Sequence, residues 1–388
     1  MPTKRIATPA RRLAGWPAAL AVAAALLAGS QVPAAAQDAG PGLTTPTVFA
    51  PHDPGAPRCT APAGLARSLA FAKDNERDFI QGVDRGLAMA ARDRGLAYRV
   101  TQANNDADRM LAHLRELRAD RTGGVVVAPV DPDSSSRSLQ ETMGSGAYVG
   151  TIVAPPATSL LNAPQYLTGK TLGDAAAAHI RRRLPRANVV LLTHDSIEFL
   201  TPRFVALRDA LKTVPGAAIV ADISPATVDF EGGFRTMQTI LQAHPTIDVV
   251  LGADTVVLGA LAALRAAGKD RPDQFLGGID GEPGAVAEIK KRNSPYKASI
   301  ALSSPVFGYA MGQHAADWLE GKSVPQGMDI LPSALTIDNI ARYEADLADP
   351  AAVYADPVRR ASYLKMYGNI CYDSRDRYVN FPWSSERK

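Results

Sequence analysis

The sequence predicts an α/β protein with two lobes, each built on a doubly wound parallel sheet. Short apolar runs alternate regularly with amphipathic helical stretches along most of the chain. Such alternation predicts parallel sheets with crossover helices, and strands that are almost wholly apolar indicate burial on both faces. Nine strand–helix units are more than one ordinary open sheet contains. A chain of 388 residues is long enough to form two hydrophobic cores.

The elements follow from hydrophobic periodicity taken in chain order. Strands are expected at residues 64–71, 97–101, 124–128, 147–152, 188–192, 218–222, 248–252, 275–279 and 298–301. Helices are expected at residues 79–94, 106–119, 134–144, 171–183, 203–214, 230–244, 255–267, 283–292 and 305–320. Beyond residue 340 the pattern breaks into an aromatic-rich, Pro-punctuated extension with one expected helix at 357–367.

The first 36 residues have the layout of a secretory signal peptide. A basic start is followed by the apolar stretch 18–28 and by Ala34-Ala35-Ala36 before Gln37. The apolar stretch is short for a membrane span, which disfavours a retained anchor. Because the leader contains the pair Arg11-Arg12, the sequence is compatible with export by the general secretory route or by the twin-arginine route. Removing the leader's four positive charges from a net +3 leaves −1, so the basicity is no evidence for nucleic-acid binding.

Residues 37–63 are rich in Pro, Gly and Ala and predict an irregular N-terminal arm. The two cysteines lie at opposite ends of the mature chain, Cys59 in this arm and Cys371 in the extension. An exported protein meets an oxidising compartment, where two cysteines can pair. We therefore expect one disulfide that fastens the extension, against the alternative of two buried free thiols.

Enzymatic motifs are missing from the sequence. It holds no GxSxG, HExxH, GxxxxGK[ST] or CxxC, and its six histidines are scattered. Gly281 to Gly284 is glycine-rich but lacks the GxGxxG spacing of a nucleotide loop. His194 and Asp195 follow a strand end, where they either line a cleft or form a surface loop pair. We expect neither catalysis nor a cofactor or metal.

One series of motifs is specific in order and spacing. It comprises the segments Asn104 to Asp108, Val127 to Asp131, Arg203 to Leu211, Met237 to Ala243, His244 to Asp248, Gly252 to Asp254, Leu258 to Lys269 and Gly277 to Gly284. Together these resemble the type I periplasmic sugar-binding proteins, which share a fold with the ligand-binding core of LacI-type repressors. The resemblance spans roughly residues 64–335.

The resemblance implies a solute-binding protein whose two lobes close on a ligand about a three-segment hinge. The expected bounds are 64–160 with 303–332 for lobe 1, 161–302 with 333–340 for lobe 2, and 341–388 for the extension. It also implies a periplasmic monomer that binds a small molecule for an ABC permease in the inner membrane, with no nucleic-acid partner. A LacI-type regulator is disfavoured because a leader, and no helix-turn-helix, precedes the core.

Two ligand-binding residues of the second lobe are carried over from the family's motifs. Arg203 opens the helix after the fifth strand, where the family has an arginine that contacts the ligand. Positive charge is unfavourable at a helix start, which argues against a plain surface arginine. Asp280, in Ile279-Asp280-Gly281, matches the family's ligand-binding aspartate, with helix capping as the alternative.

Four further residues are candidates for the pocket. Asp254 either contacts the ligand or caps the helix that follows, because the family's Asn-Asp pair reads Ala253-Asp254. Phe79 either stacks on a sugar ring or packs in the core. One or two residues of the preceding loop, which holds Lys73, Asp74, Asn75 and Arg77, should reach the cleft.

Two departures from the family concern ligand choice. Leu302 stands where a glutamine is often found, and Gly169-Lys170 where an Asp-Asn pair opens the second lobe's first helix. These departures are therefore compatible with a ligand that has fewer hydroxyl groups than a pentose or hexose. A sugar or sugar-like compound is favoured, with a carboxylated or aromatic solute as one alternative. A sensor subunit that signals to a membrane receptor is the other.

Overall fold

The computed structural model describes residues 50–152, 156–195 and 200–377, which all belong to one compact unit of the chain. The predicted leader, residues 37–49 of the arm and the last eleven residues lie outside them. No helix among the described residues is both long and apolar enough to cross a bilayer.

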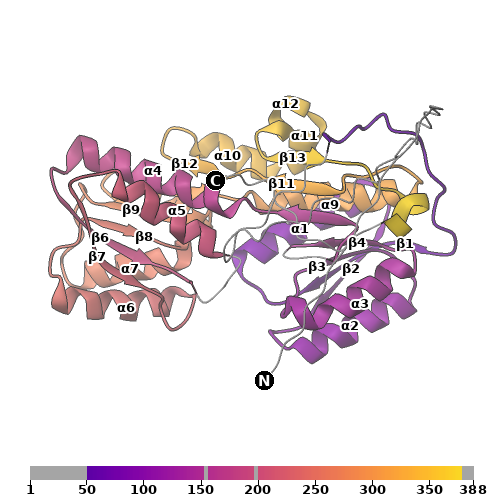
Figure 1. Cartoon of the computed structure of the whole chain (residues 1–388), viewed down its shortest axis with the longest axis horizontal. Helices are drawn as coiled ribbons and strands as arrows, with labels where there is room; N and C mark the ends of the chain where they lie inside the picture. Colours follow the sequence, from indigo (N-terminus) through magenta and orange to yellow (C-terminus); the bar gives the residue numbers. More distant parts are fainter. Residues whose placement is uncertain (1–49, 153–155, 196–199, 378–388) are drawn as a thin grey trace, which may run out of the picture. The chain divides into compact units, whose positions relative to one another are not determined.

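Two sheets form the body of the molecule, as the sequence predicts (Figure 1). The first has seven strands in the order β13-β11-β5-β4-β3-β1-β2 and the second has six in the order β12-β10-β9-β8-β6-β7. The first contains β1 (Ala66–Lys73), β2 (Ala97–Gln102), β3 (Thr122–Val127), β4 (Tyr148–Thr151), β5 (Ser159–Asn162), β11 (Gly327–Ile330) and β13 (Leu364–Tyr367). The second contains β6 (Ala187–Leu192), β7 (Ala217–Ile223), β8 (Val249–Leu251), β9 (Phe275–Asp280), β10 (Tyr296–Ala301) and β12 (Ser333–Leu335).

Helices cover both faces of each sheet (Figure 1). Those beside the first sheet are α1 (Asp78–Asp93), α2 (Ala107–Ala119), α3 (Pro132–Gly144) and α9 (Ser304–Leu319). Those beside the second are α4 (Gln165–Arg183), α5 (Thr201–Lys212), α6 (Phe230–Ala243), α7 (Asp254–Ala266) and α8 (Pro283–Ile289). The inward stripes are apolar: in α1, for example, Ile80, Val83 and Leu87 are fully buried.

Both sheets have the same internal strand order. All pairs are parallel except β13 against β11 and β12 against β10, the antiparallel edges. Within the parallel parts the order reverses between β1 and β3 and again between β6 and β8. In open α/β sheets the ligand site lies at such a switch point, beyond the carboxyl ends of the strands. This rule favours the loops after β1 and β3 in the first sheet and after β6 and β8 in the second.

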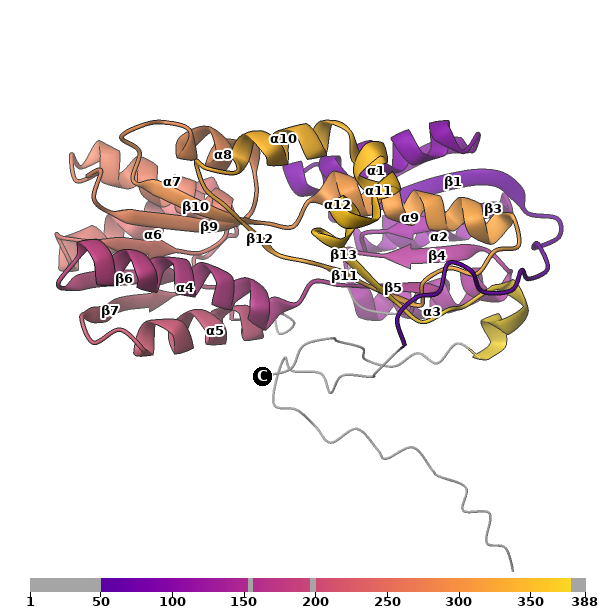
Figure 2. The same cartoon turned by 90° about the horizontal axis from the view of Figure 1, so that it is seen from above.

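The chain passes between the two sheets at three places within the predicted hinge: from β5 to α4, from β10 to α9, and from β11 to β12. It then returns a fourth time, because the extension leaves β12 and ends in β13 of the first sheet. This return runs through α10 (Ile340–Ala348), α11 (Pro350–Ala355) and α12 (Pro357–Ala361). Figure 2 shows α10 reaching from the neighbourhood of α8 towards α11.

The single helix expected at 357–367 is wrong in its second half. The helix ends at Ala361, and Leu364–Tyr367 pairs with β11 instead. Strands β5, β11, β12 and β13 were not predicted: each has only three or four residues, and no described helix separates β4 from β5 or β11 from β12, so they interrupt the regular strand–helix alternation.

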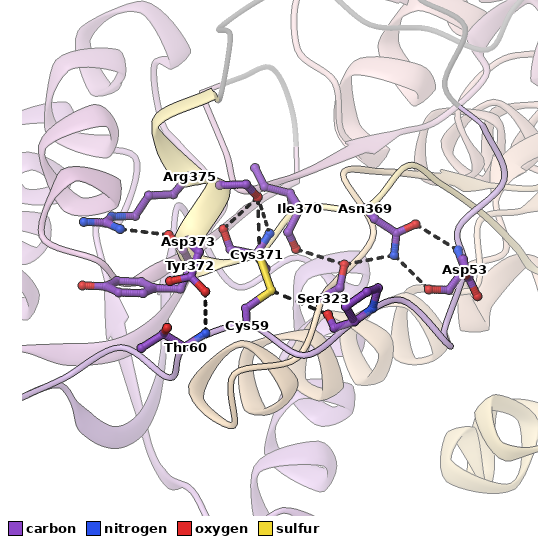
Figure 3. Close-up of a disulfide and its surroundings, with 12 residues drawn as sticks. Asp53, Cys59, Thr60, Ser323, Asn369, Ile370, Cys371, Tyr372, Asp373 and Arg375 are labelled. Carbon is purple, nitrogen blue, oxygen red and sulfur yellow. Dashed lines mark hydrogen bonds between the residues drawn. A yellow bond between two sulfur atoms is a disulfide. The ribbon is translucent and has the colours of Figure 1, made fainter.

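The two cysteines form the expected disulfide, with Cys59 of the arm bonded to Cys371 (Figure 3). Polar contacts flank it on both sides. The Thr60 amide donates to the Asp373 carboxylate at 2.5 Å, and the Asn369 side-chain amide donates to the Asp53 carbonyl and the Ser323 hydroxyl, each at 2.9 Å. These contacts fix residues 53–60 of the arm against the extension.

Candidate functional site

Charged side chains from both lobes gather beyond the carboxyl ends of the central strands. The first lobe supplies the loop after β1 and the start of α1, and the second supplies the ends of β6 and β9 and the start of α5. We call this set the candidate site; it is defined by Asp74, Asn75, Arg77, Phe79, His194, Arg203, Asp280 and Glu282. Two of the predicted residues, Arg203 and Asp280, are brought together here with Arg77 of the opposite lobe.

Arg203 is the third residue of α5 and is only 6 % exposed. Its Nε donates to the Gln165 side-chain oxygen at 2.9 Å, which aims the guanidinium from one side. The two helices that carry this pair can approach closely because residue 169 is a glycine: a Cβ there would lie 1.9 Å from the Arg203 carbonyl oxygen. Gly169, a departure from the family's pattern, thus positions the arginine.

Asp280 ends β9 in a strained backbone conformation. Its φ is +120°, a region that L residues other than glycine rarely adopt and that is often found at functional sites. Burial raises the pKa of Asp280, while the charges of Arg203 and Arg77 lower it. The charges of one arginine from each lobe therefore act on this carboxyl group.

Asp254 lies beneath the site rather than on its wall. It is fully buried at the first position of α7, and it accepts hydrogen bonds from the Tyr296 and Ser299 hydroxyls, both at 2.6 Å. The Glu282 amide donates to it at 2.9 Å. Burial raises its pKa to about 6. Asp254 thus joins α7, β10 and the loop after β9, which fits neither the ligand contact nor the helix cap that the sequence suggested.

Glu282 was missed by the sequence reasoning, although it stands two residues after Asp280 in the motif read there. It is partly buried, and burial together with the charges of Asp280, Asp254 and Asp78 raises its pKa to about 8. The charge of Arg77 acts in the opposite direction. A carboxyl with this pKa carries its proton at neutral pH and can donate as well as accept a hydrogen bond.

The first-lobe loop is internally paired. Asp74, 7 % exposed, accepts from the Asn75 amide at 2.8 Å and from Arg77 Nη1 at 2.7 Å. Asn75 in turn donates to the Asn105 side-chain oxygen at 3.0 Å. Lys73 pairs with Glu76 at 3.0 Å and with Asp84 at 3.3 Å. The loop is therefore a preformed polar surface with little charge left unmatched.

Phe79, the second residue of α1, shows features of both predicted roles, stacking on a ligand and packing in the core. It is partly exposed, and its ring lies 5.7 Å from that of Phe307, tilted by 45°. Packing fixes one face of the ring while part of it stays accessible. Leu302, the other apolar position, is buried at 4 % exposure.

His194 and Asp195 behave differently from each other. His194 is 3 % exposed, its ring lies edge-on to Phe204, and Nε2 has no hydrogen-bond partner among the described residues. Burial and the charge of Arg203 lower its pKa to about 4. Asp195 faces outward and pairs with Arg208 at 2.5 Å. Only the histidine belongs to the candidate site.

Gln165 was the other omission. The sequence placed the start of its helix at residue 171, six residues late, because the first turn contains Thr and Gly and follows Pro164. The Thr168 hydroxyl donates back to the Pro164 carbonyl at 2.7 Å, which closes that turn. The amide that the departure at Gly169-Lys170 seemed to remove is thus present one turn earlier.

The arrangement suits binding of hydroxyl groups. Arg203 presents hydrogen-bond donors that are fixed in place, and Asp280 presents acceptors. The Glu282 carboxyl can both donate and accept a hydrogen bond. Among the described residues the grouping of possible metal ligands is Cys59, Cys371 and Asp373, far along the chain, where the sulfur atoms are bonded to each other.

The chain is similar to known proteins in both sequence and fold. Residues 70–323 match the model of the periplasmic binding protein domain family, about two thirds of the chain. The ribose import binding protein RbsB of Bacillus subtilis (strain 168) is 26 % identical over 267 residues, which cover 63 % of this chain and 79 % of that protein. The RbsB of Salmonella typhimurium is 27 % identical over 237 residues, covering 58 % and 75 %.

Solved structures share the fold. An ABC transporter solute-binding protein from Bacillus halodurans C-125 with bound myo-inositol has a TM-score of 0.63 at 20 % identity, covering 73 % of this chain and 99 % of that one. One from Actinobacillus succinogenes 130z with bound D-allose has a TM-score of 0.64 at 18 % identity, covering 71 % and 99 %.

Proposed function

Because the chain belongs to the periplasmic binding protein domain family, we propose that it captures a sugar or sugar-like molecule in the candidate site for an ABC importer. What supports the proposal is that the charges of Arg203, from the same lobe, and of Arg77, from the other lobe, both act on Asp280. A ligand bound there is contacted from both lobes. The family's members are transport binding proteins, and we propose binding and release without chemical conversion.

Ligand binding is driven by polar groups that are positioned before the ligand arrives. Gln165 and Gly169 fix Arg203, and the strained backbone fixes Asp280. Little side-chain entropy is therefore lost on binding, which favours affinity. Closure of the lobes about the hinge removes water from these groups and strengthens their hydrogen bonds.

The charge balance favours a neutral polyol over an anion. Asp280, Glu282 and the buried Asp254 lie near one another on the second lobe, and each raises the pKa of a neighbour. A carboxylated solute would add another negative charge to this group. The relatives named above, for ribose, myo-inositol and D-allose, supply the compounds to try first. A carboxylated or aromatic solute remains the alternative, in which Arg203 would bind the anion and Phe79 the ring.

Calorimetric titration of the mature chain with D-ribose, D-allose, myo-inositol and benzoate tests this proposal. We expect at least one neutral polyol to bind and benzoate not to bind. Arg203→Ala should weaken binding at least thirtyfold, since loss of a charged partner in a desolvated site costs about 2–5 kcal/mol. Arg235→Ala is the matched control, because Arg235 is 76 % exposed and pairs only with Glu231 among the described residues. Equal affinity for both variants would refute the assigned site.

Export and delivery are the remaining parts of the proposal. We propose cleavage near Gln37, residence in the periplasm as a monomer, and delivery to an inner-membrane ABC permease. N-terminal sequencing of the exported chain and uptake of labelled ligand by cells lacking the gene would test these steps. Normal uptake with loss of a transcriptional response to the ligand would favour the sensor alternative.

A further inference from the structure

A cavity of about 880 Å³ lies apart from the candidate site and is lined by none of its residues. Its walls are the arm around residues 52–58, the end of α9 with the segment 322–325, and residues 354–366 of the extension. Except for the α9 end and residues 322–323, these segments lie outside the family match at 70–323. His314 lines the cavity ten residues along α9 from Ser304 at the hinge, about 15 Å along the helix axis.

Positive charge dominates the lining. Arg58, Lys322, Arg360 and Lys365 face one carboxylate, Asp317. Asp317 is already paired with Arg94 at 2.8 Å and with Lys322 at 2.9 Å. Across the ranges that the structure describes, Arg58, Arg360 and Lys365 have no carboxylate partner at all. An anion in this cavity would therefore meet several unmatched cations.

Arg360 is held in place for such a role. Its Nη1 donates to the Tyr354 carbonyl at 2.8 Å, and its guanidinium carbon lies 5.2 Å from the centre of the Tyr354 ring. The remaining N–H groups have no hydrogen-bond partner within the described part of the chain. A guanidinium that is fixed on one side and open on the other is suited to carboxylate or phosphate oxygens.

His314 supplies a second, independent sign of a ligand. It is 1 % exposed, yet neither ring nitrogen has a hydrogen-bond partner among the described residues. Its ring lies edge-on to the ring of Tyr354, which also contacts Arg360. Burial lowers its pKa to about 3, so the ring is neutral and offers one donor and one acceptor, the pair that a hydroxyl group can satisfy. Buried polar groups rarely lack partners in native proteins.

We propose that this cavity is a second binding site for a small hydroxylated organic anion, with Arg58, Arg360 and Lys365 on the anionic group and His314 on a hydroxyl. The volume is within the range of small-molecule pockets. The site does not depend on the proposed sugar binding. Because its walls come from the arm, α9 and the extension, an occupant would bridge segments that the disulfide also joins.

Calorimetry with citrate and with glycerol 3-phosphate, in a low-salt chloride buffer, tests the site and distinguishes the two anionic groups. Glycerol is the uncharged control. We expect at least one anion to bind with a dissociation constant below about 1 mM, and glycerol not to bind. Arg58→Ala and Arg360→Ala should each weaken that binding about tenfold or more, as loss of a charged hydrogen-bond donor does. Arg235→Ala and the cleft variant Arg203→Ala should leave it unchanged.

His314→Leu provides a test that is independent of folding defects. Replacing an unpartnered buried imidazole by an apolar side chain should leave the melting temperature unchanged or raise it, while anion affinity falls. The proposal is overturned if neither anion binds, if Arg360→Ala binds as the parent does, or if Arg203→Ala abolishes the binding. The last result would place the anion in the cleft.

Discussion

The two walls of the candidate site contrast in how their charges are matched. On the first lobe Asp74, Arg77 and Lys73 are paired within their own loop. On the second lobe the carboxyl groups of Asp280, Glu282 and Asp254 lie near one another, and burial raises the pKa of all three. The charged side chains of the first wall are paired with one another, whereas burial disfavours the charged form of the carboxyl groups on the second wall, and we expect the hydroxyl groups of a ligand to stabilise them. Affinity should therefore depend mainly on the second lobe.

Asp280→Asn should give the largest effect. The amide keeps the size and tolerates the positive φ, but it loses an ionic acceptor, so affinity should fall about thirtyfold or more. The melting temperature of the unliganded variant should be equal to or above that of the parent, because a carboxylate that burial disfavours is removed. Calorimetry and a thermal melt measure the two quantities. A strongly lowered melting temperature would show that Asp280 is structural.

Glu282 should make stability fall with rising pH. Its folded pKa of about 8 lies above the unfolded value of 4.5, so the folded state binds more protons between these values. Stability from this group is complete below pH 4.5 and is lost as pH rises through 8, by about 1–3 kcal/mol. Glu282→Gln should flatten that slope in urea titrations at pH 5 and pH 8.5. An unchanged slope would assign the effect to other groups.

Asp74→Asn should have a smaller effect on the paired wall. Loss of the ion pair with the half-exposed Arg77 should cost about 0.5–1 kcal/mol of stability and roughly three- to fivefold in affinity. Asp280→Asn is the variant to compare with it, and the ligand affinities of both variants are measured in the same buffer. If Asp74→Asn reduced affinity more than Asp280→Asn, the contrast between the walls would be reversed.

Phe79→Leu should have the smallest effect. The leucine fills most of the space beside Phe307 but loses the aromatic face, so a ligand that stacks there should bind about two- to fivefold more weakly. Phe79→Tyr keeps the ring and should bind as the parent does. An affinity loss shared by both variants would indicate a packing defect instead.

The nine strand–helix units were predictable because their alternation is repeated and most of their strands are largely apolar. The site was predictable only where residues match the family's motifs, as Arg203 near the start of α5 and Asp280 at the end of β9 do. Gln165 was not, since its helix turn is closed by a Thr168 hydroxyl bond that no spacing shows. The environment of Asp254 depends on Tyr296 and Ser299, forty residues away in sequence, and only the folded chain brings them together.

The disulfide between Cys59 and Cys371 also determines how the protein responds to mechanical force. A pull on the two chain ends first breaks the contacts of residues 50–53 with residues 366–369, and it is then carried through the sulfur bridge, so that the segment between the cysteines stays folded. In a single-molecule stretching experiment only the segments outside the bridge should extend. After reduction of the disulfide, the chain between the two cysteines, which are 312 residues apart, can also be stretched. Its unfolding should release about 1000 Å of chain at 3.3–3.6 Å per residue.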